Sequence, residues 1–306
     1  MSKKILAVYY TQTGQLAEII DRFISPLQEA GHTIEKLNIQ PVNKFPFPWT
    51  SPTFFDAMPE SVLLKPAELE TFEIKETHYD LIVIGFQPWF LSPSIPINSF
   101  LQHPAFKAVA NGTPVVTISG CRNMWINAQE KNKKLLKNVS ARLVGNIALV
   151  DKNNNHVSLV TILHWMFSGK KDKKWGIFPK PGVADEDIAN SIIFGKIVNE
   201  YLEKNDPSDA GWYGLQSRLQ EQKAAVVKYP LMFIERKAGK LFLIWANVIN
   251  KKKNRKAWLV VFKWYLLIAL CVAAPIILLV DLIFFRPFLG KRIKKQKQYY
   301  SGVALK

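Results

Sequence analysis

The chain has 306 residues and a formal net charge of +17, with 48% hydrophobic and 21% charged residues. This composition excludes an intrinsically disordered chain, which would contain too few apolar residues to form a core. The two cysteines, Cys121 and Cys271, lie too far apart in a chain of this length to suggest a disulfide scaffold, and they favour a reducing compartment. The length allows one or two domains.

Nearly all of the excess positive charge lies in the last third of the chain. Residues 208–306 contain 19 Lys and Arg against 4 Asp and Glu, whereas residues 1–207 contain 22 against 20. The residues 264–280 form an uncharged and mostly apolar run, which extends to 257–285 if two charged residues are tolerated. A helix of roughly 20 apolar residues can cross a bilayer, so this run predicts a membrane-associating region.

The flanks of this run indicate what it contacts. Basic segments at 251–256 and 291–297 are typical of contacts with anionic lipid headgroups, and they favour a membrane over nucleic acid as the partner. Because both flanks are basic, the positive-inside rule selects no orientation, and Pro275 allows either a single span or a re-entrant hairpin. The alternative is a buried core helix of a soluble domain. The short apolar N-terminus does not resemble a signal peptide, so we expect the cytoplasmic face of the inner (plasma) membrane.

Residues 1–204 alternate short apolar runs with helical patterns, and they predict an α/β domain, followed by a helical, membrane-associating extension at 205–306. The alternation predicts a doubly wound parallel sheet with strand order 2-1-3-4-5, whose ligand site lies at the carboxyl ends of strands one and three. The predicted strands are 3–10, 32–39, 81–86, 115–119 and 141–150. The predicted helices are 15–31, 60–72 (in part), 97–106, 123–138, 156–168 and 185–203, and 41–55 is expected to be irregular.

The loop after the first predicted strand has the composition of a phosphate cradle. Two hydroxyls, a flexible glycine and the free N–H groups of the next helix suit a phosphate monoester. The sequence there matches neither the triphosphate pattern GxxxxGK[ST] nor the dinucleotide pattern GxGxxG. The alternative is an ordinary strand-to-helix turn. The candidate residues are Thr11, Gln12, Thr13, Gly14, Gln15 and Leu16.

The loops after the third and fourth strands supply aromatic rings, backbone donors and a cation. Aromatic faces in a crevice can hold a flat ring system, although each aromatic residue could instead belong to the core. The candidates in the second loop are Pro88, Trp89 and Phe90. Those in the third loop are Gly120, Cys121, Arg122, Asn123 and Trp125.

Together, these loops resemble those of flavodoxins: TQTGQ resembles the phosphate loop, GFQPWF the second loop and GCRNMW the third. The resemblance covers residues 3–204 and implies FMN, with its phosphate on the first loop and its ring between the other two. Two features depart from the family pattern. Leu16 stands where a hydroxyl residue is usual, and the domain is near neutral, whereas flavodoxins that carry electrons are strongly acidic.

The opening KKILAVYYTQTGQLAEIID, followed by such a domain and a basic apolar tail, is similar to the bacterial family of dialkylresorcinol condensing enzymes. This resemblance implies a flavin-dependent aromatase that oxidises a 2,5-dialkylcyclohexane-1,3-dione to a dialkylresorcinol in dialkylresorcinol or flexirubin biosynthesis. It also implies a lipophilic substrate and a ketosynthase of the same pathway as a partner. The alternatives are a membrane-anchored electron carrier or quinone reductase of the flavodoxin type, and a non-catalytic membrane scaffold.

Two side chains are candidates for the chemistry of such a reaction. Arg122 can stabilise the enolate of an acidic 1,3-diketone. A base could be His164 or Tyr10, although His164 lies in an apolar stretch, which favours a core histidine over a base. Cys121 has no evident partner base, and no cluster of residues has metal-ligand spacing, so neither a cysteine nucleophile nor a metal is predicted.

Overall fold

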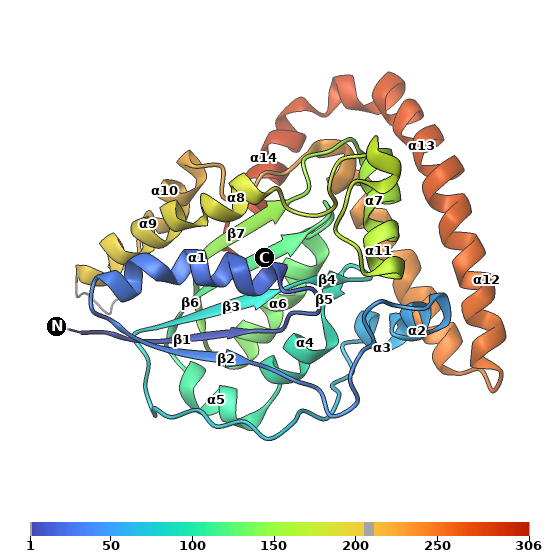
Figure 1. The fold of residues 1–306 in the computed structure, drawn as a ribbon. Coiled ribbons are helices and arrows are strands. Elements are labelled where there is room, and N and C mark those ends of the chain that lie inside the picture. Colours follow the sequence, from blue (N-terminus) through green and yellow to red (C-terminus); the bar gives the residue numbers. More distant parts are fainter. Residues whose placement is uncertain (1, 205–210, 306) are drawn as a thin grey trace.

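The structure is a computed structural model, and it describes residues 2–204 and 211–305. At its centre lies a parallel five-stranded sheet in the order β2-β1-β3-β6-β7 (Figure 1). This is the flavodoxin-like order 2-1-3-4-5, and it confirms the predicted fold class. The strands are β1 (Lys4–Tyr9), β2 (Thr33–Asn38), β3 (Leu81–Phe86), β6 (Pro114–Cys121) and β7 (Arg142–Val150).

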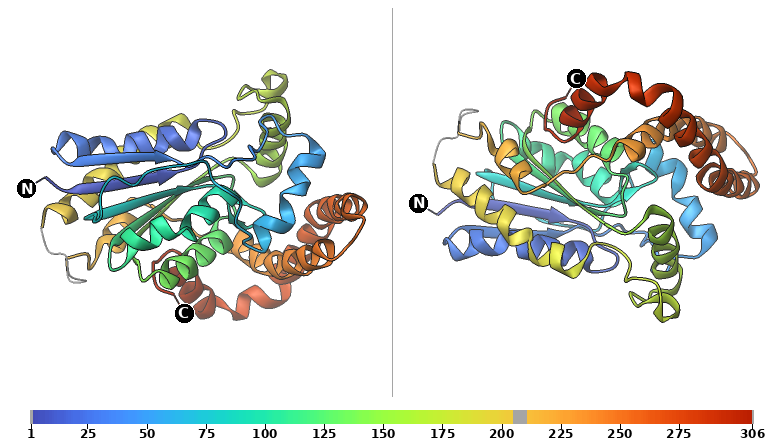
Figure 2. Two further views of the ribbon diagram at one scale, coloured as in Figure 1. Left: turned by 90° about the horizontal axis from the view of Figure 1, so that it is seen from below. Right: turned by 90° about the horizontal axis from the view of Figure 1, so that it is seen from above.

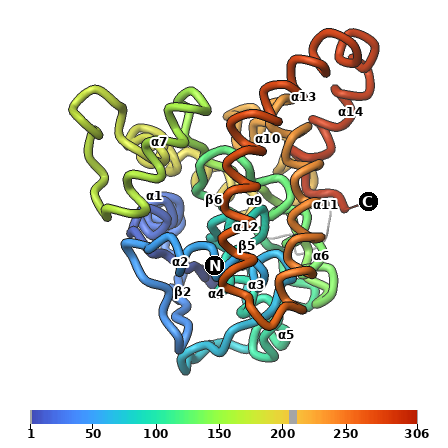
Figure 3. Tube along the Cα trace, turned by 90° about the vertical axis from the view of Figure 1, so that its right-hand side faces the viewer, coloured from blue at the N-terminus to red at the C-terminus, as the bar shows by residue number. Residues whose placement is uncertain are grey.

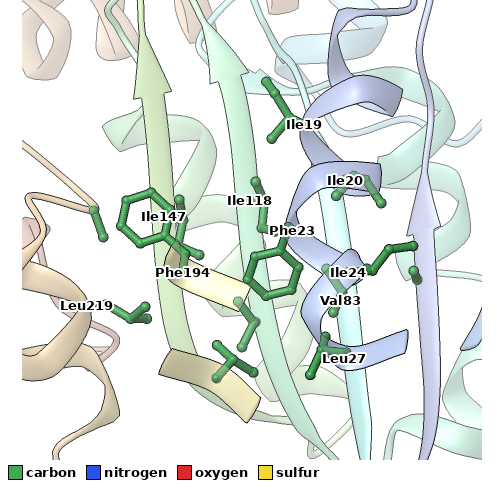
Figure 4. Close-up of a cluster of buried hydrophobic side chains, with 14 of the residues drawn as sticks. Ile19, Ile20, Phe23, Ile24, Leu27, Val83, Ile118, Ile147, Phe194 and Leu219 are labelled. Atoms are coloured by element: carbon green, nitrogen blue, oxygen red, sulfur yellow. The ribbon is translucent and has the colours of Figure 1, made fainter. Parts of the chain in front are cut away.

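Helices cover both faces of the sheet, as the apolar strands require (Figure 2). Every residue of β3 is buried, because each of its faces meets a layer of helices. On one face lie α1 (Gln15–Glu29), α8 (Asp185–Ala189), α9 (Ser191–Glu203) and α10 (Leu215–Glu221), and Phe23, Phe194 and Leu219 belong to the core between this layer and the sheet (Figure 4). The other face carries α4 (Ile95–Leu101), α5 (Pro104–Ala110) and α6 (Ile126–Asn138).

Three predicted helices are divided or shortened in the structure. The expected helix 97–106 is the pair α4 and α5, since Pro104 begins a new helix whose first turn is capped by His103. The segment 41–55, expected to be irregular, contains the start of α2 (Ser51–Asp56), capped by Thr50, and the predicted helix in 60–72 is the shorter α3 (Met58–Val62). The helix at 185–203 is divided into α8 and α9 at Asn190.

The α/β core continues beyond the expected boundary at residue 204. Leu215 and Leu219 of α10 are fully buried in the same cluster as Phe23. The segment after α10 then adds a parallel bridge from Ala225 to Ala148 of β7. Next, α11 (Tyr229–Asn250) packs against α3 and α6. The segment 211–250 therefore packs as part of the α/β domain.

The apolar run forms one continuous helix of 34 residues, Arg255–Phe288, here called the long helix. Among the described residues, it is the one helix long and apolar enough to cross a membrane, and hardly any of its most apolar part is buried. It comprises α12 (Arg255–Ile268), a wide turn at Ala269–Ala273, α13 (Ala274–Val280) and the short turns Asp281–Phe285 and Arg286–Phe288. A basic helix, α14 (Gly290–Tyr300), follows it.

Candidate functional site

A cavity of about 760 Å³ lies at the carboxyl ends of β1, β3 and β6, at the point where the strand order reverses. Ligand sites of α/β sheets are expected there. The structure brings the three predicted loops together around this cavity. Their lining residues are Gln12, Thr13, Gln15, Leu16, Gln87, Pro88, Trp89, Phe90, Leu91, Gly120, Cys121, Arg122, Asn123 and Met124.

The first loop is held in shape by its own residues. Gly14 adopts the left-handed conformation with φ 82°, and its backbone N–H donates to Thr11 Oγ1 at 3.0 Å. Thr11 therefore closes the loop, and neither it nor Gly14 lines the cavity. Within the described part of the chain, no side chain caps the start of α1. The N–H groups of its first turn remain as donors at the positive end of the helix dipole.

The side chain of Gln15 is engaged by the fold. Its side-chain amide makes two hydrogen bonds to the backbone of Val183, accepting at 3.1 Å and donating at 3.2 Å. This clamp holds the loop containing Gly182 across the first loop. A Cβ at Gly182 would come within 2.7 Å of Trp165 and 2.8 Å of Gln15 Oε1, which explains the glycine. The amide of Gln15 is thus occupied by the fold, while Leu16 is buried in the core and also lines the cavity.

The second loop is a minimal hairpin of β4 (Pro88–Trp89) and β5 (Ser92–Pro93). Its two turn residues, Phe90 and Leu91, have φ values of 46° and 60°, which favour Asn or Gly in such turns and cost bulky residues about 1–3 kcal/mol each. Both bulky side chains line the cavity. The hairpin thus directs an aromatic and an aliphatic side chain to the site at the expense of backbone strain.

Aromatic rings from separate segments meet the hairpin. Trp89 packs edge-on against Trp49 and against Tyr10, with 5.5 Å and 5.9 Å between the ring centroids. The ring centroids of Phe90 and Phe54 are 4.8 Å apart. Trp49, Trp89, Phe54 and Phe90 all line the cavity. This side of the cavity is therefore an aromatic wall that can face a flat ring system.

The third loop supplies a cation and a free acceptor. Arg122 donates a hydrogen bond to the carbonyl of Asn155 at 3.4 Å. Burial lowers the pKa of its guanidinium, and the nearby carboxylate of Asp151 opposes this shift. The guanidinium stays charged, as it does in proteins generally. Asn123 Nδ2 donates to Asn155 Oδ1 at 2.6 Å, whereas the buried Oδ1 of Asn123 has no partner among the described residues. Both side chains line the cavity.

Trp125 and Cys121 contribute little to the chemistry of the cavity. Trp125 is only 2% exposed and packs in a separate cluster with Ala225 and Tyr229. It was predicted to lie at the site, but it does not line the cavity. Burial raises the pKa of the Cys121 thiol far above its usual value, which keeps the thiol neutral and a poor nucleophile. Among the described residues, no group of three or more His, Cys, Asp or Glu could hold a metal.

The structure does not bring the predicted base together with Arg122. His164 Nε2 lies 2.7 Å from Asp172 Oδ1, and His164 does not line the cavity, although its neighbours Leu163 and Trp165 do. Tyr10 is buried behind Trp89, and this burial raises its pKa. Among the described lining residues, Arg122 and Lys263 carry charge, and both are cations.

About half of the cavity wall comes from segments that the sequence did not assign to the site. The aromatic density of 45–55 was a usable signal, and so was the largely apolar stretch of α7 (Asn155–Ser168). No local signal placed α12 at the site. The residues concerned are Phe47, Trp49, Thr50, Ser51, Phe54, Phe55 and Ala57, then Leu159, Ile162, Leu163, Trp165, Met166, Phe167 and Gly182, and finally Phe242, Lys263, Leu266, Leu267 and Leu270.

No protein-family model and no curated protein sequence matches the chain. Solved structures do match. A flavoprotein in complex with FMN from Lactobacillus acidophilus has a TM-score of 0.40 and 17% identity, over 48% of this chain and 93% of its own. A flavodoxin from the domain Archaea has a TM-score of 0.37 and 9% identity, over 65% and 99%. Flavodoxin 1 from Bacillus cereus has a TM-score of 0.33 and 15% identity, over 63% and 95%.

These similarities are too distant to assign a ligand or an activity. The class of the protein rests on its own strand order: it is a flavodoxin-like α/β protein with a long apolar helix in its C-terminal part.

Proposed function

We propose that the protein is an FMN-dependent oxidoreductase that converts a 2,5-dialkylcyclohexane-1,3-dione into a dialkylresorcinol. One observation carries the proposal. The cavity at the switch point of the sheet extends from an uncapped helix start in α1 to the apolar side chains of α7 and α12. Both of the charged residues that the described chain contributes to its wall are cations. Such a cavity suits an anionic cofactor next to an apolar substrate that becomes an anion.

The residues present fit FMN. The N–H groups of the first turn of α1 and the Thr13 hydroxyl would hold the phosphate, which needs no lysine there. Trp89 and Phe90 would flank the ring, and the unpaired Oδ1 of Asn123 is a buried acceptor for one of its N–H groups. When bound, FMN supplies the two-electron redox chemistry that no side chain of the cavity can provide.

The chain's own residues would handle charge and water. The dione loses two electrons and two protons to become the aromatic diol, and either dioxygen or a quinone accepts the electrons in the end. An enolised 1,3-diketone is acidic, and Arg122 stabilises its anion in a partly buried site where electrostatic interactions are strong. No carboxylate among the described lining residues opposes this anion. The aromatic and aliphatic walls exclude water.

The apolar walls set the substrate class. Each buried CH₂ group contributes about 0.8 kcal/mol, so two alkyl chains favour both the Leu- and Ile-rich wall and a lipid phase. We place the protein at the cytoplasmic face of the inner membrane, on anionic lipids, with a ketosynthase of the same pathway as the source of the dione.

The direct test mixes the purified full-length protein anaerobically with a synthetic dione. We expect loss of the yellow flavin absorbance and formation of the resorcinol, detected by mass spectrometry. Persistent yellow flavin without resorcinol would reject the aromatase. If the protein, once its flavin is reduced with dithionite, then reduces a quinone, the quinone reductase replaces it, and if no flavin copurifies, the non-catalytic scaffold does.

A further inference from the structure

The first end of the long helix is fixed to the α/β domain. Arg255 Nη1 donates to Glu60 Oε1 at 2.6 Å and its Nε donates to Asp56 Oδ1 at 2.9 Å. Both carboxylates belong to the short helices α2 and α3 beside the cavity. Phe262, about two turns further along, is fully buried against α11. The helix therefore starts on the domain and runs alongside α11 (Figure 3).

The other end of the long helix is also fixed to the domain. Asp281 is only 3% exposed, and it accepts a hydrogen bond from Tyr229 Oη of α11 at 3.0 Å. After the helix, α14 returns to the domain, where Tyr299 Oη donates to Glu130 Oε2 at 2.6 Å. Lys133 Nζ of α6 donates to the carbonyl of Ala304 at 3.0 Å. The chain thus leaves and rejoins the same body (Figure 1).

Between these two ends, the outer face of the long helix is apolar, and no other part of the described chain covers it. Side chains spaced three or four residues apart along it are each more than half exposed: Val260, Trp264, Ile268, Val272, Ile276, Leu279 and Ile283. The two charged residues that interrupt the run lie toward the protein, because Lys263 lines the cavity and Asp281 bonds to Tyr229.

The surfaces at both ends of this face are strongly basic. Exposed cations lie at or before its first turn at Lys251, Lys252, Lys253 and Lys256, and others lie at or after its last turn at Arg286, Lys291, Arg292, Lys294, Lys295 and Lys297. The one acidic residue between 251 and 305 is the buried Asp281. An apolar face with cations at both ends is complementary to a leaflet of anionic lipids.

We propose that the long helix enters a single anionic leaflet and keeps both of its ends on the side of the α/β domain. A span would carry α14 to the far side, and it would separate Tyr299 from Glu130 and Lys133 from Ala304. It would also bring the carboxylate of Asp281 into hydrocarbon without Tyr229, which is costly. Attachment to one leaflet keeps these contacts and covers the outer face.

This attachment gives the cavity a route to the lipid, a step that rests on the proposed function. Leu266, Leu267 and Leu270 of the long helix line the cavity, while Trp264 and Ile268 of the same helix face outward. Phe167 of α7 is both exposed and part of the lining. A lipophilic dione dissolved in the leaflet can therefore enter beside α7 and α12 without passing through water.

The sidedness is tested without flavin or dione. In a Cys121→Ser, Cys271→Ser background, which removes both native thiols, single cysteines can be read one at a time. Glu29→Cys reports on the domain, Lys253→Cys on the start of the long helix and Lys295→Cys on the segment beyond it, all at exposed positions. The label is a membrane-impermeant maleimide, applied to inverted and to right-side-out membrane vesicles.

We expect all three cysteines to react from the same side. If Lys295→Cys reacts from the side opposite to the other two, the long helix spans the bilayer and the proposal is wrong. It is also wrong if the full-length protein stays in the supernatant of a detergent-free lysate, in particular as a dimer that covers the apolar face with a second copy.

The lipid chemistry is tested by sedimentation with phosphatidylcholine vesicles, with and without phosphatidylglycerol. Reversal of three charges at Lys251, Lys252 and Lys253 to Glu should weaken binding to the anionic vesicles by about tenfold or more. A matched reversal at Lys107, Lys134 and Lys137, exposed lysines of the domain, should change it far less. Equal losses in both triple variants would show an effect of net charge alone and would contradict the proposed contact.

The entry route is tested by comparing a long-chain dione in anionic vesicles with a short-chain, water-soluble dione. The Lys251/252/253→Glu variant should lose most of its turnover of the long-chain dione and keep that of the short-chain one. Equal turnover of the long-chain dione in variant and wild type would overturn the route. Turnover of neither dione by the wild type would refute the proposed function, while the sidedness result would stand on its own.

Discussion

Glu235 of α11 and Asn127 of α6 bind each other through two hydrogen bonds. The backbone N–H of Asn127 donates to Glu235 Oε1, and Asn127 Nδ2 donates to the carbonyl of Glu235, both at 2.7 Å. Asn127 lies in the first turn of α6, directly after the third loop of the cavity. Glu235 is completely buried, and this burial raises the pKa of its carboxyl group to about 8. A helix beyond residue 204 thus supports a loop of the site.

The raised pKa of Glu235 predicts a dependence of stability on pH. Between its usual pKa of 4.5 and about 8, the folded state keeps the proton and the unfolded state loses it. The free energy of unfolding should therefore fall as the pH rises through this window, by at most about 1.4 kcal/mol per pH unit from this group. Glu235→Gln keeps an acceptor for Asn127 and should flatten this fall.

The measurement is denaturant unfolding of both proteins at several pH values from 5 to about 9. Glu29→Gln, at an exposed carboxylate, is the control and should leave the slope as in the wild type. Parallel curves for Glu235→Gln and wild type would show that the carboxyl group is ionised in the folded state.

The sequence predicted the sheet well, because its signal is local. Runs such as LIVIGF are buried on both faces of a parallel sheet, and the alternation of strands and helices leaves few possible strand orders. The loops that follow these strands were consequently placed at the correct edge. Gly14, Trp89 and Arg122 lie at this edge, as expected.

The direction of each side chain was beyond the reach of the sequence. Trp89 and Trp125 follow strands in similar loops, yet Trp89 lines the cavity and Trp125 turns into a cluster with Tyr229 of α11. His164 and Leu163 are neighbours on α7, and Leu163 alone of the two lines the cavity. These differences depend on contacts with α11 and α12, which are distant in sequence, and with the loop after α7. No pattern in the sequence links these segments to the site.

Gly14 should matter through its backbone conformation. A Cβ at this position would meet no atom within 4 Å, so crowding is not the obstacle, but the φ of 82° disfavours residues with a side chain. Gly14→Val should cost about 1–2 kcal/mol in the left-handed region and distort the loop, lowering FMN affinity by about tenfold or more. Gly14→Asn, which tolerates this region, should lose much less.

Fluorescence titration of the flavin-free protein with FMN measures this difference. Circular dichroism of both variants checks that the fold is retained. Equal affinities for the Val and Asn variants would show that the conformation of Gly14 does not shape the phosphate site.

Truncation after Glu203 should yield an unstable domain. It removes Leu215 and Leu219, both fully buried in the core beneath α1, and burial of one such side chain contributes about 1.5–3 kcal/mol. Truncation after Asn250 keeps both leucines and Glu235. The two fragments are compared by the urea concentration at which half of the protein unfolds, and a midpoint for the shorter fragment equal to that of the longer one would contradict the role assigned to α10.

Arg122 should govern flavin reduction without governing flavin binding. Its guanidinium lines the cavity in a partly buried position, where a cation stabilises an enolate more strongly than it would in water. Removal of one such group from an enzyme costs on the order of 100-fold in rate. Arg122→Ala should therefore slow the anaerobic reduction of the flavin by the dione by about this factor, and Arg122→Lys should recover part of the loss because it keeps the charge.

Lys263→Ala, which removes the other cation of the wall, is the matched comparison and should have a smaller effect, since Lys263 stands on α12 rather than in a loop that follows a strand. Flavin content per protein, read from the absorbance ratio, should be the same in all four proteins. A rate that falls only in proportion to lost flavin would move Arg122 from the chemistry to the binding of the cofactor.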